Sequence, residues 1–471
     1  RESGFSLDRL VFSQVITLNS SQLDALLNWN LSETHFTDAD PGDSNWSTAG
    51  NWTGGMPTAS SVAYIGDGKT AALSAAGAQA DRLSIGHDNA TLPGDGTLNQ
   101  SGGDLTVVDR LNIGINATDG GAVTGAYNVT SGTLTVGTPT TGRADLYVGR
   151  VTASHAVNPA SGTLDLSGAS EFNALLDEFA IGVRTTGGDA GEYGMATGNV
   201  TLAATNNIDA TTLLLSESFM YGTVPQSTLT LGTLNNFNVD TLTVSGFRGV
   251  SVMQFGTGGG TLNLSGSSGP ATDLKIANCW QGTNSSLSGH MDMTGGVLNA
   301  TLDDVLIGYD ITGPGGTGSP GPGPSETGAA PANSLTLGDA GSGRATGTIN
   351  MNGGSFTLNG DASLGTGTAV SSGTINMTAG TFTVNGNVTG GVGTSTLNID
   401  GGTMNVTGDL DVDNLQVGHN GRTASVSVTG DVNIGSSLTI GRRSSNSVNS
   451  GVLTEGSLDL SGANSVTINV D

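Results

Sequence analysis

The sequence predicts an all-β protein, a right-handed parallel β-helix (β-solenoid) of roughly 22–26 residues per coil, with a non-repeating N-terminal arm or cap. A motif recurs at that spacing, glycine-rich turns separate short alternating runs, and the composition disfavours helices. Of 471 residues, 77 are glycine, and only 11% are charged. The strong helix formers Lys and Glu are scarce, whereas Asp, Asn, Gly and Thr favour turns and strands.

The recurring motif reads GTINMNGGSFTL at 347–358, GTINMTAGTFTV at 373–384 and STLNIDGGTMNV at 395–406, at offsets of 26 and 22 residues. A second element, Leu-x-Ile-Gly, lies between copies, as at 83–86 and 111–114. Side chains alternate along a strand, so each run places its apolar residues on one face. Three short strands per unit bury that face only when successive units stack, which is how a solenoid forms its core.

Pattern and composition divide the chain into five segments. These are an N-terminal arm or cap at 1–37, a segment leading into the repeat at 38–75, the first part of the solenoid at 76–308, a Pro/Gly-rich loop excursion at 309–333, and the second part of the solenoid at 334–471. The first segment either covers the first coil of its own chain, with a short helix, or packs as an extended arm on a neighbouring molecule.

One stretch, 170–256, matches the repeat poorly, and we expect longer coils there. Its phenylalanines are predicted to fill the core: Phe172, Phe179, Phe219, Phe237, Phe247 and Phe255. A string of β-sandwiches is the other all-β interpretation. It is disfavoured because the repeating unit is too short for a domain and aromatic core anchors are few.

The formal net charge of −26 leaves too few cations for a basic patch, which argues against nucleic-acid binding and against anchoring on an anionic membrane. No apolar stretch reaches the length of a transmembrane segment. The single cysteine, Cys279, excludes an intrachain disulfide, and we expect a buried thiol there. The first residues are not those of a signal peptide, so we expect that any export signal has been removed.

Residues 44–57 read SNWSTAGNWTGGMP, with Trp46 and Trp52 ahead of a predicted strand at 62–66 and glycine-rich repeats. This arrangement resembles the start of bacterial secreted β-solenoid proteins with autotransporter-associated strand repeats, including surface proteins of planctomycete-like bacteria and of the PEP-CTERM kind. The resemblance implies a secreted, surface-associated bacterial protein without catalytic residues.

An enzyme of this shape would need paired carboxylates, or a basic residue beside acidic ones. The candidate groups are Asp273 with Lys275, Asp303 with Asp304, and His290 with Asp292. Residues two apart on a strand share a face. No cluster of basic and aromatic residues marks a sugar-binding groove, so the sequence predicts that the chain is not an enzyme.

No cofactor is predicted, and Ca²⁺ is the one candidate metal. Asp409, Asp411 and Asp413 alternate, so their carboxylates share a face and repel one another unless solvent or a cation separates them. A second acidic run, Asp38, Asp40 and Asp43, resembles part of a Ca²⁺ loop without its closing glutamate. Surface turns account for both runs more simply.

Repeated polar steps suggest two further surface roles. Thr-x-Thr pairs such as Thr133/Thr135 and Thr381/Thr383 could stack into an ice-binding hydroxyl face, although ordinary outward strand residues are the favoured interpretation. Asn-x-Ser/Thr triplets could carry surface glycans, although an Asn- and Thr-rich composition produces them by chance. They include Asn45, Asn51, Asn128, Asn376 and Asn405.

The two ends of the chain have complementary patterns. The last stretch has the form of another coil with no cap after it, whereas the first is apolar and lies outside the repeat. The residues predicted to form the assembly contact are Phe5, Leu7, Leu10, Val11, Phe12, Val15 and Ile16 in the arm, and Val466, Ile468 and Val470 in the last coil. Addition of one molecule's arm to the next molecule's bare edge propagates as a fibre.

The predicted function is therefore structural: a self-assembling subunit of an extracellular bacterial filament, sheath or surface matrix. The first alternative is a surface adhesin that binds carbohydrate. The second alternative is a polysaccharide lyase or hydrolase built on a β-helix.

Overall fold

The computed structural model describes residues 31–39, 42–88, 94–153, 156–185, 194–218, 226–246, 249–279, 288–293, 296–310, 335–340, 346–365, 372–419, 421–442 and 453–469. Strands dominate these residues, and the helical content described is one 3₁₀ turn, η1 (Ala49–Asn51).

The strands of the first part are β1 (Ser32–His35), β2 (Ser61–Ile65), β3 (Lys69–Leu73), β4 (Ala78–His87), β5 (Gly96–Asn116), β6 (Val123–Val136), β7 (Ala144–Val151), β8 (Ala160–Asp165), β9 (Glu171–Arg184), β10 (Ala196–Thr201), β11 (Thr205–Ser218), β12 (Gln226–Leu231), β13 (Leu234–Gly246), β14 (Val250–Phe255), β15 (Thr261–Ser265), β16 (Thr272–Cys279), β17 (Ser288–Asp292) and β18 (Val297–Asp310). Those of the second part are β19 (Leu335–Ala340), β20 (Thr346–Leu358), β21 (Ala362–Leu364), β22 (Ser372–Val384), β23 (Val388–Gly390), β24 (Thr394–Ile399), β25 (Gly402–Val406), β26 (Leu410–His419), β27 (Thr423–Val428), β28 (Val432–Arg442), β29 (Glu455–Asp459) and β30 (Val466–Ile468).

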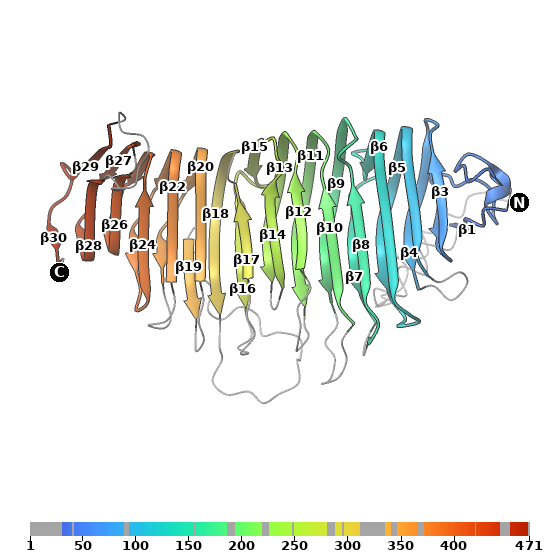
Figure 1. The fold of residues 1–471 in the computed structure, drawn as a ribbon, viewed down its shortest axis with the longest axis horizontal. Helices are drawn as coiled ribbons and strands as arrows, with labels where there is room; N and C mark the ends of the chain where they lie inside the picture. Colours follow the sequence, from blue (N-terminus) through green and yellow to red (C-terminus); the bar gives the residue numbers. More distant parts are fainter. Residues whose placement is uncertain are drawn as a thin grey trace, which may run out of the picture.

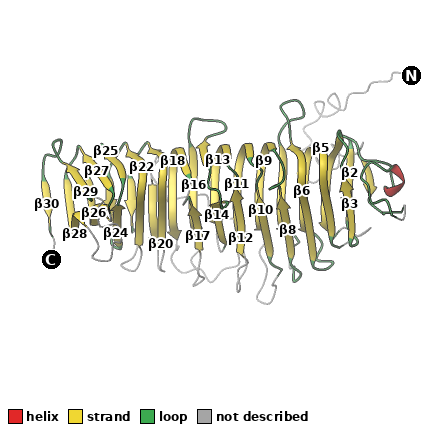
Figure 2. Ribbon diagram, turned by 45° about the horizontal axis from the view of Figure 1, so that its top comes forward, coloured by secondary structure: helices red, strands yellow, loops and turns green. Residues whose placement is uncertain are grey.

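These strands stack in parallel into one long column, with β1 at one end and β30 at the other (Figures 1 and 2). The long strand β5 defines three faces: residues 96–100 lie on face 1, 104–107 on face 2 and 110–116 on face 3. Each segment pairs in parallel with strands of the coils before and after it. The predicted parallel β-solenoid is confirmed.

The core is a single apolar cluster that runs along the column. On face 1, Leu98 points inward and is fully buried, while Asn99 points outward and accepts a hydrogen bond from Asn128 Nδ2 of the next coil at 3.0 Å. Phe356 and Phe382 stack edge to face in successive coils, with ring centroids 4.7 Å apart. The alternating pattern of the motif therefore places one set of side chains in the core and the other in outward ladders.

The glycine of the Leu-x-Ile-Gly element turns the chain near the end of face 3. Its members Gly86, Gly114, Gly149 and Gly182 all have φ between +66° and +69°, the left-handed region that glycine occupies without strain. A Cβ on Gly114 would lie 2.0 Å from the carbonyl oxygen of Ser161. Both the conformation and the close approach therefore require glycine at this position.

Coil length varies because loops leave the column at its corners. The ladder bonds Asn376–Asn350 and Asn398–Asn376 join residues 26 and 22 apart, as the motif spacing predicts. The bond Asn299–Asn263 joins residues 36 apart. Insertions thus lengthen a coil without disturbing the register of the stacked strands.

The excursion predicted at 309–333 separates two direct neighbours. Strand β18 precedes it, β19 follows it, and Val305 pairs with Leu335 and Ile307 with Leu337 on face 3. Residues 311–334 lie outside the described part of the chain. The column itself starts earlier than residue 76, because β2 pairs with both β1 and β4.

Candidate functional site: the two ends of the column

An aromatic cluster closes the N-terminal end of the column. The Trp52 ring meets Trp46 and Phe36 edge to face, with centroids 4.8 and 5.1 Å away, and its Nε1–H donates a hydrogen bond to the Trp46 carbonyl oxygen at 2.8 Å. All three side chains are buried. The inward residues of the first coil beneath them are fully buried as well: Ala63, Ile65, Ala71 and Leu73.

The same segment covers the strand edges at that end. On the edge of β1, the amide of Thr53 donates to the His35 carbonyl oxygen at 3.0 Å, and the His35 amide donates to Thr53 Oγ1 at 2.9 Å. On the edge of β3, the Trp46 amide donates to the Ala72 carbonyl oxygen at 2.7 Å. Uncovered edges recruit further strands, so this Gly-Asn-Trp segment acts as the cap of the column.

The buried Asn51 holds the cap in shape. Its Nδ2 donates to the carbonyl oxygens of Asp43 and Asn45, and Asp43 in turn accepts from the Asn45 amide and from Thr48 Oγ1. The carboxylate of Asp43 is thus part of a turn. The other predicted Ca²⁺-loop residues are Asp38, which has a positive φ of 52°, and Asp40, which lies outside the described residues.

The last described coil leaves its apolar columns exposed. On face 3, Val432 and Ile434 are 2% and 0% exposed, whereas Val466 and Ile468, which pair with them one coil later, are 46% and 42% exposed. On face 1, Val417 is fully buried and Ile440, its partner in the last coil, is 46% exposed. The same positions change from core to surface because no described coil follows.

Strand β30 is hydrogen-bonded on its inner side, where it pairs with β28 and the Asn469 amide donates to the Ile434 carbonyl oxygen at 2.8 Å. Among the described strands, no other pairs with it. Of the residues predicted to assemble, Val466 and Ile468 therefore lie on the last edge. The others, Phe5, Leu7, Leu10, Val11, Phe12, Val15, Ile16 and Val470, lie outside the described residues.

The alternating aspartates Asp409, Asp411 and Asp413 do not gather into a metal site. Asp409 Oδ1 accepts from the Asp431 amide, Asp411 Oδ1 from Asn433 Nδ2, and Asp413 Oδ2 from the amide and hydroxyl of Ser395. Asp409 and Asp411 thus both bind the following coil, whereas Asp413 binds Ser395, which lies 18 residues earlier in the chain. Over the described ranges, no three His, Cys, Asp or Glu side chains are close enough to share an ion.

The predicted acidic and basic pairs occupy ordinary strand positions. His290 Nε2 lies 4.0 Å from Asp292 Oδ2 on β17, and both side chains are more than a third exposed. Asp273 and Lys275 take alternate positions on β16. The side chains of Asp303, Asp304 and Cys279 lie outside the described residues.

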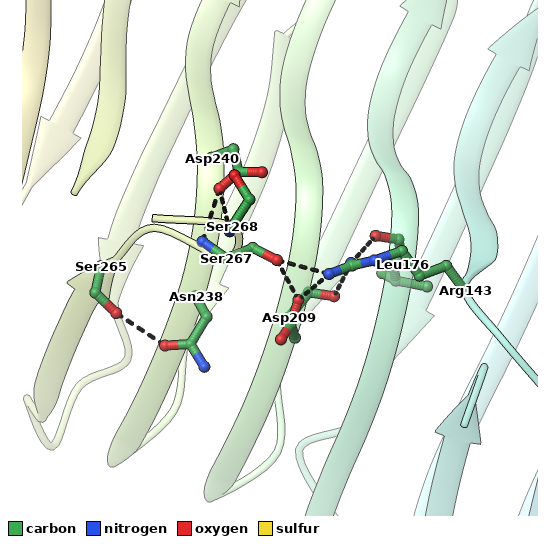
Figure 3. Close-up of polar contacts among 8 residues, drawn as sticks. All are labelled: Arg143, Leu176, Asp209, Asn238, Asp240, Ser265, Ser267 and Ser268. Carbon is green, nitrogen blue, oxygen red and sulfur yellow. Dashed lines mark hydrogen bonds and ion pairs between the residues drawn. The ribbon is translucent and has the colours of Figure 1, made fainter. Parts of the chain in front are cut away.

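Asp273 borders an open hollow of about 410 Å³, lined also by Asp240, Pro270 and Asn359. Figure 3 shows how its wall is built: the amides of Ser267 and Ser268 donate to Asp240 Oδ1 at 2.8 and 2.7 Å. Burial acts to raise the pKa of Asp240, but these bonds outweigh it and hold the pKa below its ordinary value. The carboxylate is therefore occupied in shaping a turn.

Arg143 ties this turn to earlier coils. Its Nη2 donates to Asp209 Oδ1 and to Ser267 Oγ, both at 2.6 Å, and its Nη1 donates to the Leu176 carbonyl oxygen at 2.6 Å (Figure 3). Arg143 and Asp209 are 66 residues apart in the sequence. This contact could not be predicted from the sequence, because the repeat pattern does not specify which corners of different coils lie side by side.

Other cations follow the outer side of face 3. Arg110 binds Asp145 at 3.0 Å, and the Arg150 guanidinium lies 3.7 Å from the centroid of Tyr147. The Tyr147 hydroxyl donates to Glu178 Oε2 at 2.8 Å. Burial, together with the nearby Glu178 charge, raises the pKa of Glu217 to about 7. These groups link neighbouring coils.

A stack of rings lies beside the cap. His35 stacks on Tyr64, and the His87 ring packs against Tyr64 at a tilt of 56°, with centroids 4.8 Å apart in each case. Burial and the charge of His35 lower the pKa of His87 to about 4. The buried His87 is therefore neutral at neutral pH.

The outward polar positions form ladders that use their hydrogen-bonding groups. Of the asparagines in the Asn-x-Ser/Thr triplets, Asn51 is fully buried. The side-chain amides of Asn128 and Asn376 donate hydrogen bonds to the preceding coil. The threonine columns are mixed, since Thr133 pairs with Glu171 and Thr135 with Asn173. A uniform threonine face does not form there.

No family model, curated protein or solved structure matches this chain. The described residues include no helix with the length and hydropathy needed to span a membrane. The described residues define the class: a parallel β-solenoid whose described part has a cap at one end and an apolar strand edge at the other.

Proposed function

We propose that the chain is a structural subunit of an extracellular bacterial filament, sheath or surface matrix, and that it assembles head to tail. The observation that carries this proposal is the contrast between the ends of the column. One end is sealed by Trp46 and Trp52, and the other presents Val466, Ile468 and Ile440 to solvent.

The contrast favours a polar chain over a closed dimer. Two different surfaces in contact make a heterologous interface, which repeats along a line when it does not close into a ring. The capped end cannot simply stack on the open coil because residues 44–46 and 51–55 already cover its strand edges. A strand donor from outside the column is needed, and the apolar residues 5–18 supply one. The extracellular setting rests on the likeness to secreted bacterial solenoid proteins.

Charge placed on the open edge tests this function. The double variant Val466→Asp/Ile468→Asp replaces the apolar contacts, whereas Thr467→Asp places one charge on the same strand between them. We expect the wild-type chain and Thr467→Asp to form multimers that sediment, and the double variant to remain monomeric with an unchanged circular dichroism spectrum. A wild-type chain that stays monomeric at high concentration would contradict the proposal.

Removal of residues 1–18 tests the donor. The truncated chain should keep its β-sheet spectrum, because the column starts at β1, and should lose polymerisation. If it forms fibres as readily as the full chain, the arm is not the donor.

A further inference from the structure

The last described coil has three strand edges, and they are not equivalent. On face 2, β29 carries Leu458, which is packed against the core. On face 1, β28 carries the exposed Ile440 beside Leu438, which is also packed against the core. On face 3, both inward residues of β30 are more than 40% exposed, Val466 at 46% and Ile468 at 42%. Face 3 thus offers the largest gain in burial to an added strand.

The sequence of the arm contains a counterpart of β30. Residues 16–19 read Ile-Thr-Leu-Asn, and residues 466–469 read Val-Thr-Ile-Asn. Both have a β-branched or leucine residue at the first and third positions, threonine at the second and asparagine at the fourth. In the parallel register of this column, like positions lie side by side, as Val432 and Ile434 do with Val466 and Ile468. An added strand with this pattern would place two apolar residues inward and threonine beside threonine.

The arm is too short to reach β30 of its own chain, so the added strand must come from a second copy. Strand β1 lies on face 3 at the far end of the column from β30 (Figure 1). The two strands are about 70 Å apart by ordinary strand spacing. The residues between Asn19 and Leu31 span at most about 40 Å when fully extended. They cannot reach the last coil of their own chain, but they can pass the cap and reach an abutting molecule.

We propose that residues 16–19 of a second copy add to β30 as a parallel strand on face 3, with Ile16 beside Val466, Thr17 beside Thr467 and Leu18 beside Ile468. This pairing rests on the proposed head-to-tail function and specifies its contact. Asn19 then lies beside Asn469.

Cysteine pairs test the register. In a Cys279→Ser background, which removes the one native thiol, Thr17→Cys and Thr467→Cys are introduced together. Neighbouring strands lie about 4.8 Å apart, within the Cα separation that a disulfide spans. We expect oxidation of the assembled protein to give a ladder of covalent multimers on a non-reducing gel. The control pairs Thr17→Cys with Asn433→Cys, one strand further from the edge, and should give no ladder.

The outcomes separate the contact from the function. Multimers that sediment but do not crosslink through 17 and 467 would overturn the pairing and leave head-to-tail assembly standing. Absence of multimers in the wild-type chain would overturn both. If Thr467→Cys alters the circular dichroism spectrum, Asn19→Cys with Asn469→Cys tests the same register, and its failure to crosslink assembled protein is equally decisive.

Discussion

Gly114 and Gly125 lie on either side of one corner, so close that a Cβ on Gly125 would be 2.2 Å from the Gly114 amide nitrogen. Gly114 lies near the end of face 3 of one coil, and Gly125 lies at the start of face 1 of the next. The two recurring glycines of the sequence, in Leu-x-Ile-Gly and in Gly-Thr-x-Asn, are thus two sides of the same turn. The number of residues between them is the length of the connection from one coil to the next.

Substitution at this corner should be costly. Gly114→Ala puts an L-residue at φ +67° and a Cβ 2.0 Å from the Ser161 carbonyl oxygen. We expect a loss of at least about 2 kcal/mol from strain and displacement of the neighbouring coil. The matched control is Gly258→Ala, where a Cβ meets nothing within 4 Å. Equal thermal midpoints for the two variants would show that the corner tolerates a side chain.

The asparagine ladder on face 2 should stabilise the middle of the column. Asn236 donates to Asn207 Oδ1 at 3.0 Å and accepts from Asn263 Nδ2 at 2.9 Å. Asn236→Ala should cost about 1–2 kcal/mol, near 1 kcal/mol for each bond. Asn236→Asp should cost at least as much at pH 7, because its carboxylate would face Asn207 Oδ1 without a proton to donate. Thermal unfolding measures both losses of stability. An Asn236→Asp variant as stable as the wild-type chain would contradict the assignment of Asn236 as the donor to Asn207.

The cap should protect the coils beneath it. Trp52→Ala removes two ring contacts and a buried hydrogen bond, a change that costs about 3–5 kcal/mol in packed sites. Each coil of a repeat protein contacts only its neighbours, so the loss should be local. Hydrogen exchange should show reduced protection in β1, β2 and β3 and unchanged protection in β22 to β26. Uniform loss along the column would contradict a local cap.

Acid should weaken the N-terminal end through His87. Its pKa is lowered from 6.5 to about 4, so the unfolded chain takes up a proton between these values while the folded chain does not. Stability is therefore complete above pH 6.5 and falls as the pH drops towards 4, by up to about 3 kcal/mol for the region that holds His87. Below pH 4 this contribution is constant.

The control is His87→Phe, which keeps a ring beside Tyr64 and cannot titrate. The carboxylates that also titrate in this range are common to both chains, so the difference between the two proteins isolates His87. Exchange protection of β2 and β4 should fall between pH 6.5 and 4.5 in the wild-type chain and fall less in the variant. Parallel pH profiles would contradict the assignment.

The sequence was sufficient for the repeating part of the fold. Period-two alternation and the recurring glycines specify which residues face the core, as Leu98 and Phe382 illustrate. In the poorly matching stretch, Phe172, Phe179, Phe237 and Phe255 are buried as predicted, whereas Phe219 and Phe247 lie outside the described residues. There Ser216 and Ser245 take the left-handed corner position, with φ of 58° and 65°, so the glycine pattern is lost although the register continues.

The ends and the lateral contacts could not be predicted to the same degree. Trp46 and Trp52 were recognised as a motif, but their capping role depends on how residues 44–55 fold back over β1 and β3. The contact between Arg143 and Asp209 depends on loop lengths in two intervening coils. Asp409, Asp411 and Asp413 alternate in the sequence, yet their carboxylates bind three different residues: Asp431, Asn433 and Ser395.

Electron cryomicroscopy of the concentrated full-length chain tests head-to-tail assembly most directly. We expect unbranched filaments in which every column points the same way, with an added strand resolved along the outer edge of β30 before the next aromatic cap. Separate rods of one column each, or pairs joined by like ends, would contradict it.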